Sequence, residues 1–215
     1  MKNLLYKEFK LALSPVMLVY LACSVLLLIP SWPFFCAFLY LLTGFLVMFF
    51  NARANRDIFF TACLPIRKRD IVYARVYTIV LFELMQVVVA IPFACLYPLI
   101  SPQGNTAGMN PNFAFFGFLL ILYAVFNAIL FPWHYKTAYQ VGMPMFTAIF
   151  VWMLIAGGVE VAVHVVPVLN SSLNAAGTGH LGSQLLVLGA GAVFFILFTW
   201  LAARKAARNF DKVDV

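Results

Sequence analysis

Charged residues are scarce in this sequence: only 10% of its 215 residues are Asp, Glu, Lys or Arg, while 65% are hydrophobic. A water-soluble domain of this length needs roughly a quarter of its residues charged to cover its surface. The deficit excludes a soluble globular protein and indicates that lipid surrounds most of the chain.

The sequence also lacks the short motifs of common enzymes. It holds no G-x-x-x-x-G-K-[ST] phosphate loop, no H-E-x-x-H and no G-x-S-x-G, and its three histidines are scattered. Its four cysteines show no paired metal-ligand spacing, so we interpret them as small apolar packing residues. These absences argue against an enzyme, and they require any energy source to lie in another chain or in an ion gradient.

What is present is a series of six apolar runs, each long enough to cross a bilayer, which takes about 20 residues. In hydrocarbon the backbone has to satisfy its own hydrogen bonds, so each run is expected to be a helix. The predicted class is therefore all-α, a polytopic membrane protein forming a single transmembrane domain over residues 1–215. The expected spans are residues 11–29, 32–50, 71–100, 113–133, 141–169 and 181–203.

The basic residues predict an orientation. All 14 Lys and Arg lie in, or at the edge of, alternate connections, and the connections at residues 30–31, 101–112 and 170–180 have none. By the positive-inside rule those three connections face outward, so both termini are expected on the cytoplasmic side of a cell membrane. The net charge of +7 then anchors the protein to anionic lipid, and it is not a nucleic-acid footprint.

Two amphipathic segments are expected on the cytoplasmic side. Residues 1–13 carry polar and apolar residues on opposite helical faces, which predicts a helix lying in the membrane interface. Residues 51–63 join polar residues to an apolar run, and they form either a short helix that docks on a cytosolic partner or a solvated loop. In the docking interpretation the aromatic side chains are anchors and the charged ones set orientation. The residues concerned are Arg53, Arg56, Asp57, Ile58, Phe59 and Phe60.

Polar residues inside the spans are candidates for function. Glu83 lies about 18 Å along a helix from Ile71, near the middle of the bilayer. A charge there costs about 2.5–3.5 kcal/mol on insertion scales. Gln86 lies one turn further on, and Asn127 is the polar residue of the fourth span. These residues form either a polar patch in a translocation path or an interhelical hydrogen bond with protonated Glu83.

A second intramembrane pair lies near the outer end of the fifth span. Glu160 and His164 are four residues apart, so their side chains share one helical face. We interpret them as part of an outer gate or re-entrant element, and the alternative is a purely structural pair.

The cytoplasmic side of the sequence resembles a known family. Residues 64–72, LPIRKRDIV, are similar to the L-P-[VI]-x-[RK]-x-x-[IV]-V element of ABC-2-type transporter permeases. An interfacial helix at residues 4–10, the stretch FPWHYK at 131–136 and a basic tail at 204–212 resemble further elements of that family, in the same order. The resemblance covers nearly the whole chain.

The resemblance implies a permease subunit with a cytoplasmic coupling helix between spans two and three. It implies pairing with a second, identical or homologous, permease and docking of two separate ABC ATPase subunits. ATP and Mg²⁺ are then bound by that partner ATPase, and no cofactor is expected in this chain. The implied activity is outward transport of an amphipathic or apolar cargo (a peptide, a drug or a lipid-like molecule) by alternating access.

Two other functions are compatible with the residues alone. An ion-coupled secondary transporter would use Glu83 and need no ATPase. A non-transporting membrane scaffold would use its cytoplasmic helix only to recruit a protein.

Overall fold

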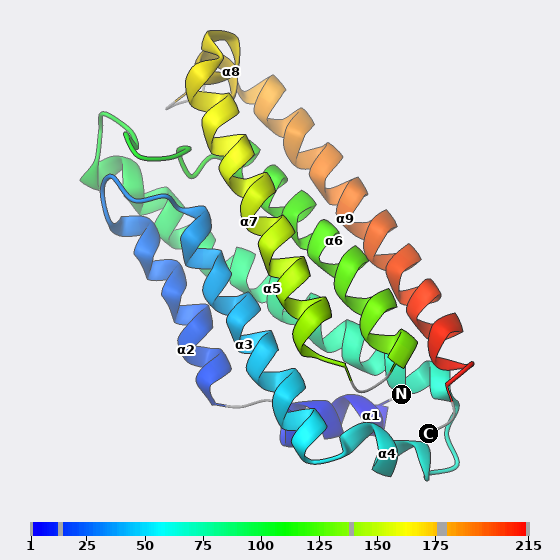
Figure 1. Cartoon of the computed structure of the whole chain (residues 1–215). Helices are drawn as coiled ribbons and strands as arrows, with labels where there is room; N and C mark the ends of the chain where they lie inside the picture. The colour runs from blue at the N-terminus through cyan, green and yellow to red at the C-terminus, as the bar shows by residue number, and fades with distance from the viewer. Residues whose placement is uncertain (1, 13–14, 138–139, 176–179, 214–215) are drawn as a thin grey trace.

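The computed structural model describes residues 2–12, 15–137, 140–175 and 180–213, and within these ranges it contains helices and turns but no strand. Figure 1 shows long helices side by side in one elongated bundle, with short helices at its two ends. The all-α prediction is confirmed for the described residues. In chain order the elements are α1 (Lys2–Lys7), the π-helical η1 (Glu8–Ala12), α2 (Val16–Ala22), the 3₁₀-helical η2 (Cys23–Leu28), α3 (Phe35–Ala54), α4 (Asp57–Ala62), α5 (Lys68–Ile100), α6 (Phe113–Thr137), α7 (Gly142–Val165), α8 (Pro167–Leu173) and α9 (Leu181–Phe210).

Five of the described helices, α3, α5, α6, α7 and α9, are long and apolar enough to cross a membrane. Each coincides with an expected span. At the first expected span the described residues form only a shorter apolar helix, Val16–Leu28, which is not among the five. Seven α-helical and six 3₁₀-helical residues rise about 22 Å, less than the roughly 30 Å of a hydrocarbon core. Residues 13–14 of that predicted span lie outside the described residues.

The fifth expected span, residues 141–169, is divided in the structure. Helix α7 ends at Val165, and Val166 is extended (φ −90°, ψ 109°) before Pro167 begins the short helix α8. A proline disfavours helical backbone in the residue before it, which explains the break. Residues 176–179, in the last expected outward connection, lie outside the described residues.

Helix α6 forms the centre of the bundle and packs along α9 over much of its length. Two glycines allow the close approach of these helices. A Cβ on Gly191 would overlap the backbone of Gly117, and a Cβ on Gly117 would lie 2.5 Å from the carbonyl oxygen of Val187. Small residues at such crossings let helix backbones approach in lipid, where packing replaces the hydrophobic effect as the driving force.

We therefore expect Gly191→Ala to lower the free energy of unfolding by about 1–3 kcal/mol, the usual cost of overpacking. The measurement is unfolding of the purified protein in mixed detergent micelles. Gly189→Ala is the matched control on the same helix, since a Cβ there meets nothing within 4 Å. Equal stability of the two variants would contradict the close α6–α9 packing.

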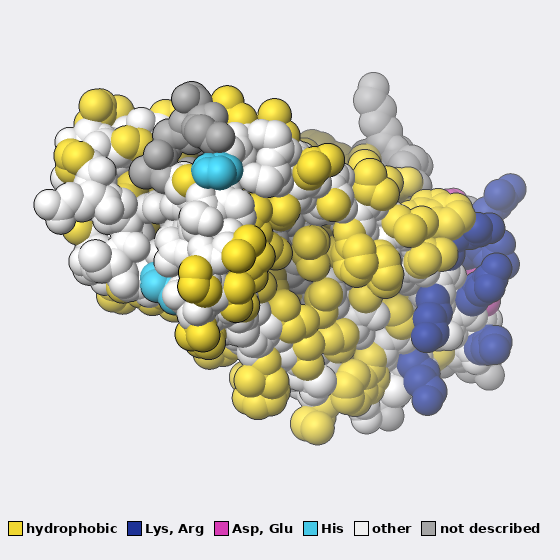
Figure 2. All heavy atoms as spheres, turned by 90° about the horizontal axis from the view of Figure 1, so that it is seen from above, with side chains coloured by type: hydrophobic (Ala, Val, Ile, Leu, Met, Phe, Trp, Pro, Cys, Tyr) yellow, Lys and Arg dark blue, Asp and Glu magenta, His cyan; other side chains and the backbone are white. Residues whose placement is uncertain are grey.

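The two ends of the bundle differ in charge. Figure 2 shows Lys and Arg side chains gathered at one end of the visible face, and hydrophobic side chains over its middle. Both chain termini lie at one end, beside α1 and α4 (Figure 1). At that end the Lys68 Nζ donates a hydrogen bond to the carbonyl oxygen of Val213, joining the start of α5 to the tail.

Candidate coupling site and intramembrane polar groups

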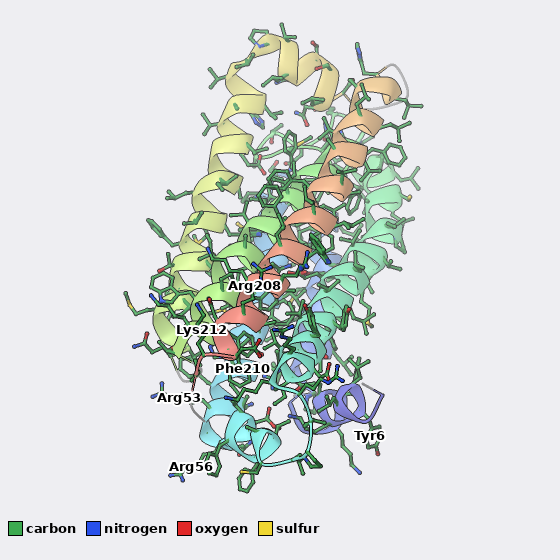
Figure 3. All side chains as sticks on the ribbon, turned by 90° about the vertical axis from the view of Figure 1, so that its right-hand side faces the viewer. Tyr6, Arg53, Arg56, Arg208, Phe210 and Lys212 are labelled. Carbon is green, nitrogen blue, oxygen red and sulfur yellow. The ribbon has the colours of Figure 1, made fainter. Side chains whose placement is uncertain are left out.

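The predicted docking segment begins at the end of α3. Arg53 lies in the last turn of α3, and Arg56 adopts a left-handed backbone (φ 51°, ψ 35°). This conformation is uncommon for a residue with a side chain, and here it turns the chain between α3 and α4. Helix α4 then starts at Asp57 and runs across the end of the bundle (Figure 1). Figure 3 shows that Arg56 and Tyr6 of α1 both lie at this end of the bundle.

Asp57 fastens the start of α4 to the N-terminal segment and to α5. Its Oδ1 accepts a hydrogen bond from Lys7 Nζ at 2.7 Å, and its Oδ2 accepts one from Arg75 Nη2 at 2.7 Å. Lys7 Nζ also donates to Thr61 Oγ1 at 2.8 Å, one turn along α4. The sequence predicts that Asp57 makes a charged contact with a partner, whereas in the structure its carboxylate is bound within the chain.

Arg75 is the centre of this arrangement, and it is buried. Its Nε lies 2.6 Å from Glu8 Oε2, and its Nη2 donates to Glu8 Oε1 at 3.1 Å, so the guanidinium holds the buried Glu8 carboxylate with two nitrogens. Lys7, Glu8, Asp57 and Arg75, which we call the charge cluster, contain two acids and two bases. They link the N-terminal segment, α4 and α5 through ion pairs with no excess charge.

The opposite face of α4 is apolar and exposed. The side chains of Phe59 and Phe60 are 52% and 67% exposed, and their rings meet edge to face at 6.3 Å. Ile58 instead packs against the core, and Thr61 is buried. Helix α4 therefore has an anchored inner face and an unpartnered aromatic outer face within the described part of the chain.

Two hollows flank α4. One, with a volume of about 230 Å³, is lined by Arg53, Arg56 and Phe59 together with His134 and Tyr135 of α6. The other, of about 420 Å³, lies along Phe60 and Leu64. The predicted coupling residues therefore lie together, and the FPWHYK stretch contributes to the wall of the same site.

The three polar residues predicted near mid-bilayer are fully buried in the chain's own bundle, and two of them, Glu83 and Asn127, are hydrogen-bonded to each other. Asn127 Nδ2 donates to Glu83 Oε2 at 2.9 Å, which joins α6 to α5. Gln86 Oε1 accepts a hydrogen bond from the hydroxyl of Tyr123 at 2.5 Å, and Asn127 Nδ2 also reaches Thr199 Oγ1 of α9 at 3.3 Å. The group links three spans by hydrogen bonds.

At the other end of the bundle, Glu160 holds a loop. Its Oε2 accepts a hydrogen bond from the backbone N–H of Met109, at 2.8 Å, in the connection before α6. His164 lies beside it as predicted, but its Nδ1 contacts the backbone oxygen of Glu160 at 2.9 Å. Asn174, which follows α8, binds the same connection through Asn110. The predicted pair therefore lies where α7, α8 and the residue 101–112 connection meet.

Several participants in these sites were not predicted from the sequence, among them Lys7, Glu8, Arg75, Tyr123 and Thr199. The signal for Glu8 and Arg75 was present, because each is a charged residue beside apolar sequence and needs an opposite charge when buried. Tyr123 and Thr199 carried no such signal. In the described part of the chain no group of His, Cys, Asp or Glu could hold a metal ion.

Five long apolar helices, buried intramembrane polar groups and a short amphipathic helix at the basic end define a multi-pass membrane protein. The family model for ABC-2 family transporter proteins matches residues 3–210, so the chain belongs to that family of membrane transport components. The resemblance found in the sequence is confirmed. Neither the curated proteins nor the solved structures compared with the chain gave a match.

Proposed function

We propose that this chain is the permease subunit of an ABC exporter and that it is driven by separate ATPase subunits. The observation that carries the proposal is the two-faced helix α4, in a member of the ABC-2 family. Its outer face presents Phe59 and Phe60 to a partner, while Asp57 on the other side is fixed to α5 through Arg75. A docking element fastened to a membrane span is what an ATP-driven permease needs.

Coupling then follows a contiguous route. Movement of a docked ATPase against α4 passes to α5 through the Asp57–Arg75 ion pair, and to the N-terminal segment through Lys7 and Glu8. Helix α5 also carries Glu83, eight residues and about 12 Å beyond Arg75. A displacement of α5 therefore changes the hydrogen bonds of the intramembrane polar group.

The proposed path for cargo involves Glu83, Gln86 and Asn127. Their burial within one chain fits a closed state, in which their hydrogen bonds run between helices and not to cargo. Glu160 and His164, with the loop that Glu160 holds, are proposed as the outer gate. A pathway with largely apolar walls and a few amide and carboxyl groups suits an amphipathic or apolar cargo. We further propose that a second permease, identical or homologous, completes the pathway.

The proposed topology has six spans, counting α2 and η2 as a short first span, with both termini in the cytoplasm. Single cysteines at residues 101–112 should react with an impermeant maleimide in intact cells. Cysteines at residues 67–69 should react only after permeabilisation. Labelling of residues 67–69 in intact cells would contradict this topology.

The proposal is tested by purifying the chain from its native cell with an affinity tag. We expect an ABC ATPase to co-purify and the chain alone to hydrolyse no ATP, because no phosphate loop occurs in the sequence. Cargo transport by the reconstituted chain with a proton gradient and no ATPase would instead establish the ion-coupled alternative at Glu83. In that case Glu83→Gln should abolish transport, because a glutamine side chain cannot bind and release a proton as a carboxylate does.

A further inference from the structure

A groove runs along the outside of the bundle between α5 and α9, and it shares only Thr199 with the sites described above. Its volume is about 370 Å³, within the range of small-molecule sites. Leu120 of α6 contributes to its lining, and the other lining residues come from α5 and α9, among them Tyr77, Leu84, Phe195 and Trp200. The lining is almost wholly apolar, so a bound group must be apolar too.

The length and position of the groove match one leaflet of a bilayer. Its lining extends from Tyr73 to Leu84 on α5 and from Ala192 to Ala203 on α9. Eleven residues of helix rise about 16 Å, and half of a hydrocarbon core is about 15 Å. The groove starts near the basic end of the bundle, because Tyr73 is close to the start of α5 and Ala203 is close to the end of α9.

The end of the groove at this basic side carries a positive charge. Arg204, next to Ala203, is exposed, and its guanidinium stacks over the Trp200 ring at 4.4 Å. Among the described residues, Arg204 belongs to no ion pair, whereas Arg69 of α5 is paired with Asp211 at 2.7 Å. Trp with Arg or Lys at this level is typical of side chains that contact lipid headgroups.

We propose that this groove binds one acyl chain of an anionic phospholipid, from the leaflet at the basic end, with the lipid phosphate against Arg204. The groove opens outward between two membrane-crossing helices, and side chains that flank it, such as Leu81 and Val193, are exposed, so it faces bilayer lipid. A flexible chain about one leaflet long fits its dimensions, and the anionic headgroup complements the unpaired guanidinium.

The test uses the fluorescence of Trp200 in the full chain, reconstituted in phosphatidylcholine vesicles. Phosphatidylglycerol or phosphatidylcholine, each with dibrominated acyl chains, is added in increasing fractions. The Trp200 signal is taken as the difference in fluorescence between wild type and Trp200→Phe. We expect saturable quenching, with half-saturation at an about fivefold lower fraction for the anionic lipid, the effect of one basic residue near an anionic headgroup.

Two matched pairs of variants locate the ligand. Ala192→Phe fills the groove and should remove the saturable quenching, whereas Val193→Phe, on the exposed lipid face beside it, should not. Arg204→Gln should abolish the preference for phosphatidylglycerol, whereas Lys205→Gln should retain it.

Three results would overturn the proposal. The first is quenching that rises linearly and equally for both lipids, which indicates ordinary contact with bulk lipid. The second is saturable quenching that Ala192→Phe leaves unchanged. The third is a Trp200 signal that no brominated lipid quenches, which would show that a second copy of the chain covers the groove.

Discussion

Replacing both Phe59 and Phe60 by Ala is expected to detach the ATPase or to uncouple ATP hydrolysis from transport. Both rings are exposed on the outer face of α4, and their packing against the bundle is slight. Aromatic anchors of this kind typically contribute about 2 kcal/mol or more to an interface, so affinity should fall at least about 30-fold. The measurements are recovery of the ATPase with the tagged chain and ATP hydrolysis by the recovered complex.

Membrane insertion should persist in this double variant, because no span is altered. Tyr6→Ala is the matched control: this ring is 65% exposed and lies on α1 at the same end of the molecule (Figure 3). Wild-type recovery and hydrolysis in the double variant, at equal expression, would rule out α4 as the docking element.

Arg75→Met is expected to destabilise the protein severely. It leaves the buried Glu8 carboxylate without its guanidinium partner and removes one of the two cations that hold Asp57. Removing one partner of a buried ion pair lowers the free energy of unfolding by about 3–5 kcal/mol, because the other partner is left as an uncompensated buried charge. The free energy of unfolding in mixed micelles and the protease sensitivity of α4 should both report the loss.

The matched control for Arg75 is Arg69→Gln. Arg69 is on the same helix and is also paired with an aspartate at 2.7 Å, but its side chain is 61% exposed. An exposed ion pair contributes little to stability, because water screens it. Adding Glu8→Gln to Arg75→Met should recover part of the stability, since it removes the unpaired charge. If Arg75→Met and Arg69→Gln were equally stable, the charge cluster would not hold α4 in place.

The long helices could be predicted from sequence because their physical requirement is local. A run of about 20 apolar residues has few alternatives to a membrane-crossing helix, and α3, α5, α6, α7 and α9 accordingly appear where the sequence places them. The short apolar helix at Val16–Leu28 was not predictable in the same way. Hydropathy does not distinguish α-helix from the 3₁₀-helix of η2, nor does it show where α2 begins after Pro15.

The sites were predictable to different degrees. Glu83, Gln86 and Asn127 stand out in sequence because polar groups in lipid are costly; the structure buries all three and joins Glu83 to Asn127. The charge cluster could not be assembled from sequence, because Glu8 and Arg75 are 67 residues apart and their pairing depends on how α1 and η1 pack against α5. For the same reason Asp57 was interpreted as a contact for a partner, although Arg75 and Lys7 occupy it.

The central claim, that the ATPase engages α4, is tested most directly by placing a photoreactive benzoylphenylalanine at position 60. The chain is then irradiated in membranes that contain its native partners, and the cross-linked products are identified by mass spectrometry. The predicted result is a cross-link from position 60 to an ABC ATPase. A product in which position 60 cross-links to lipid alone, in membranes where the ATPase is present, would contradict the claim.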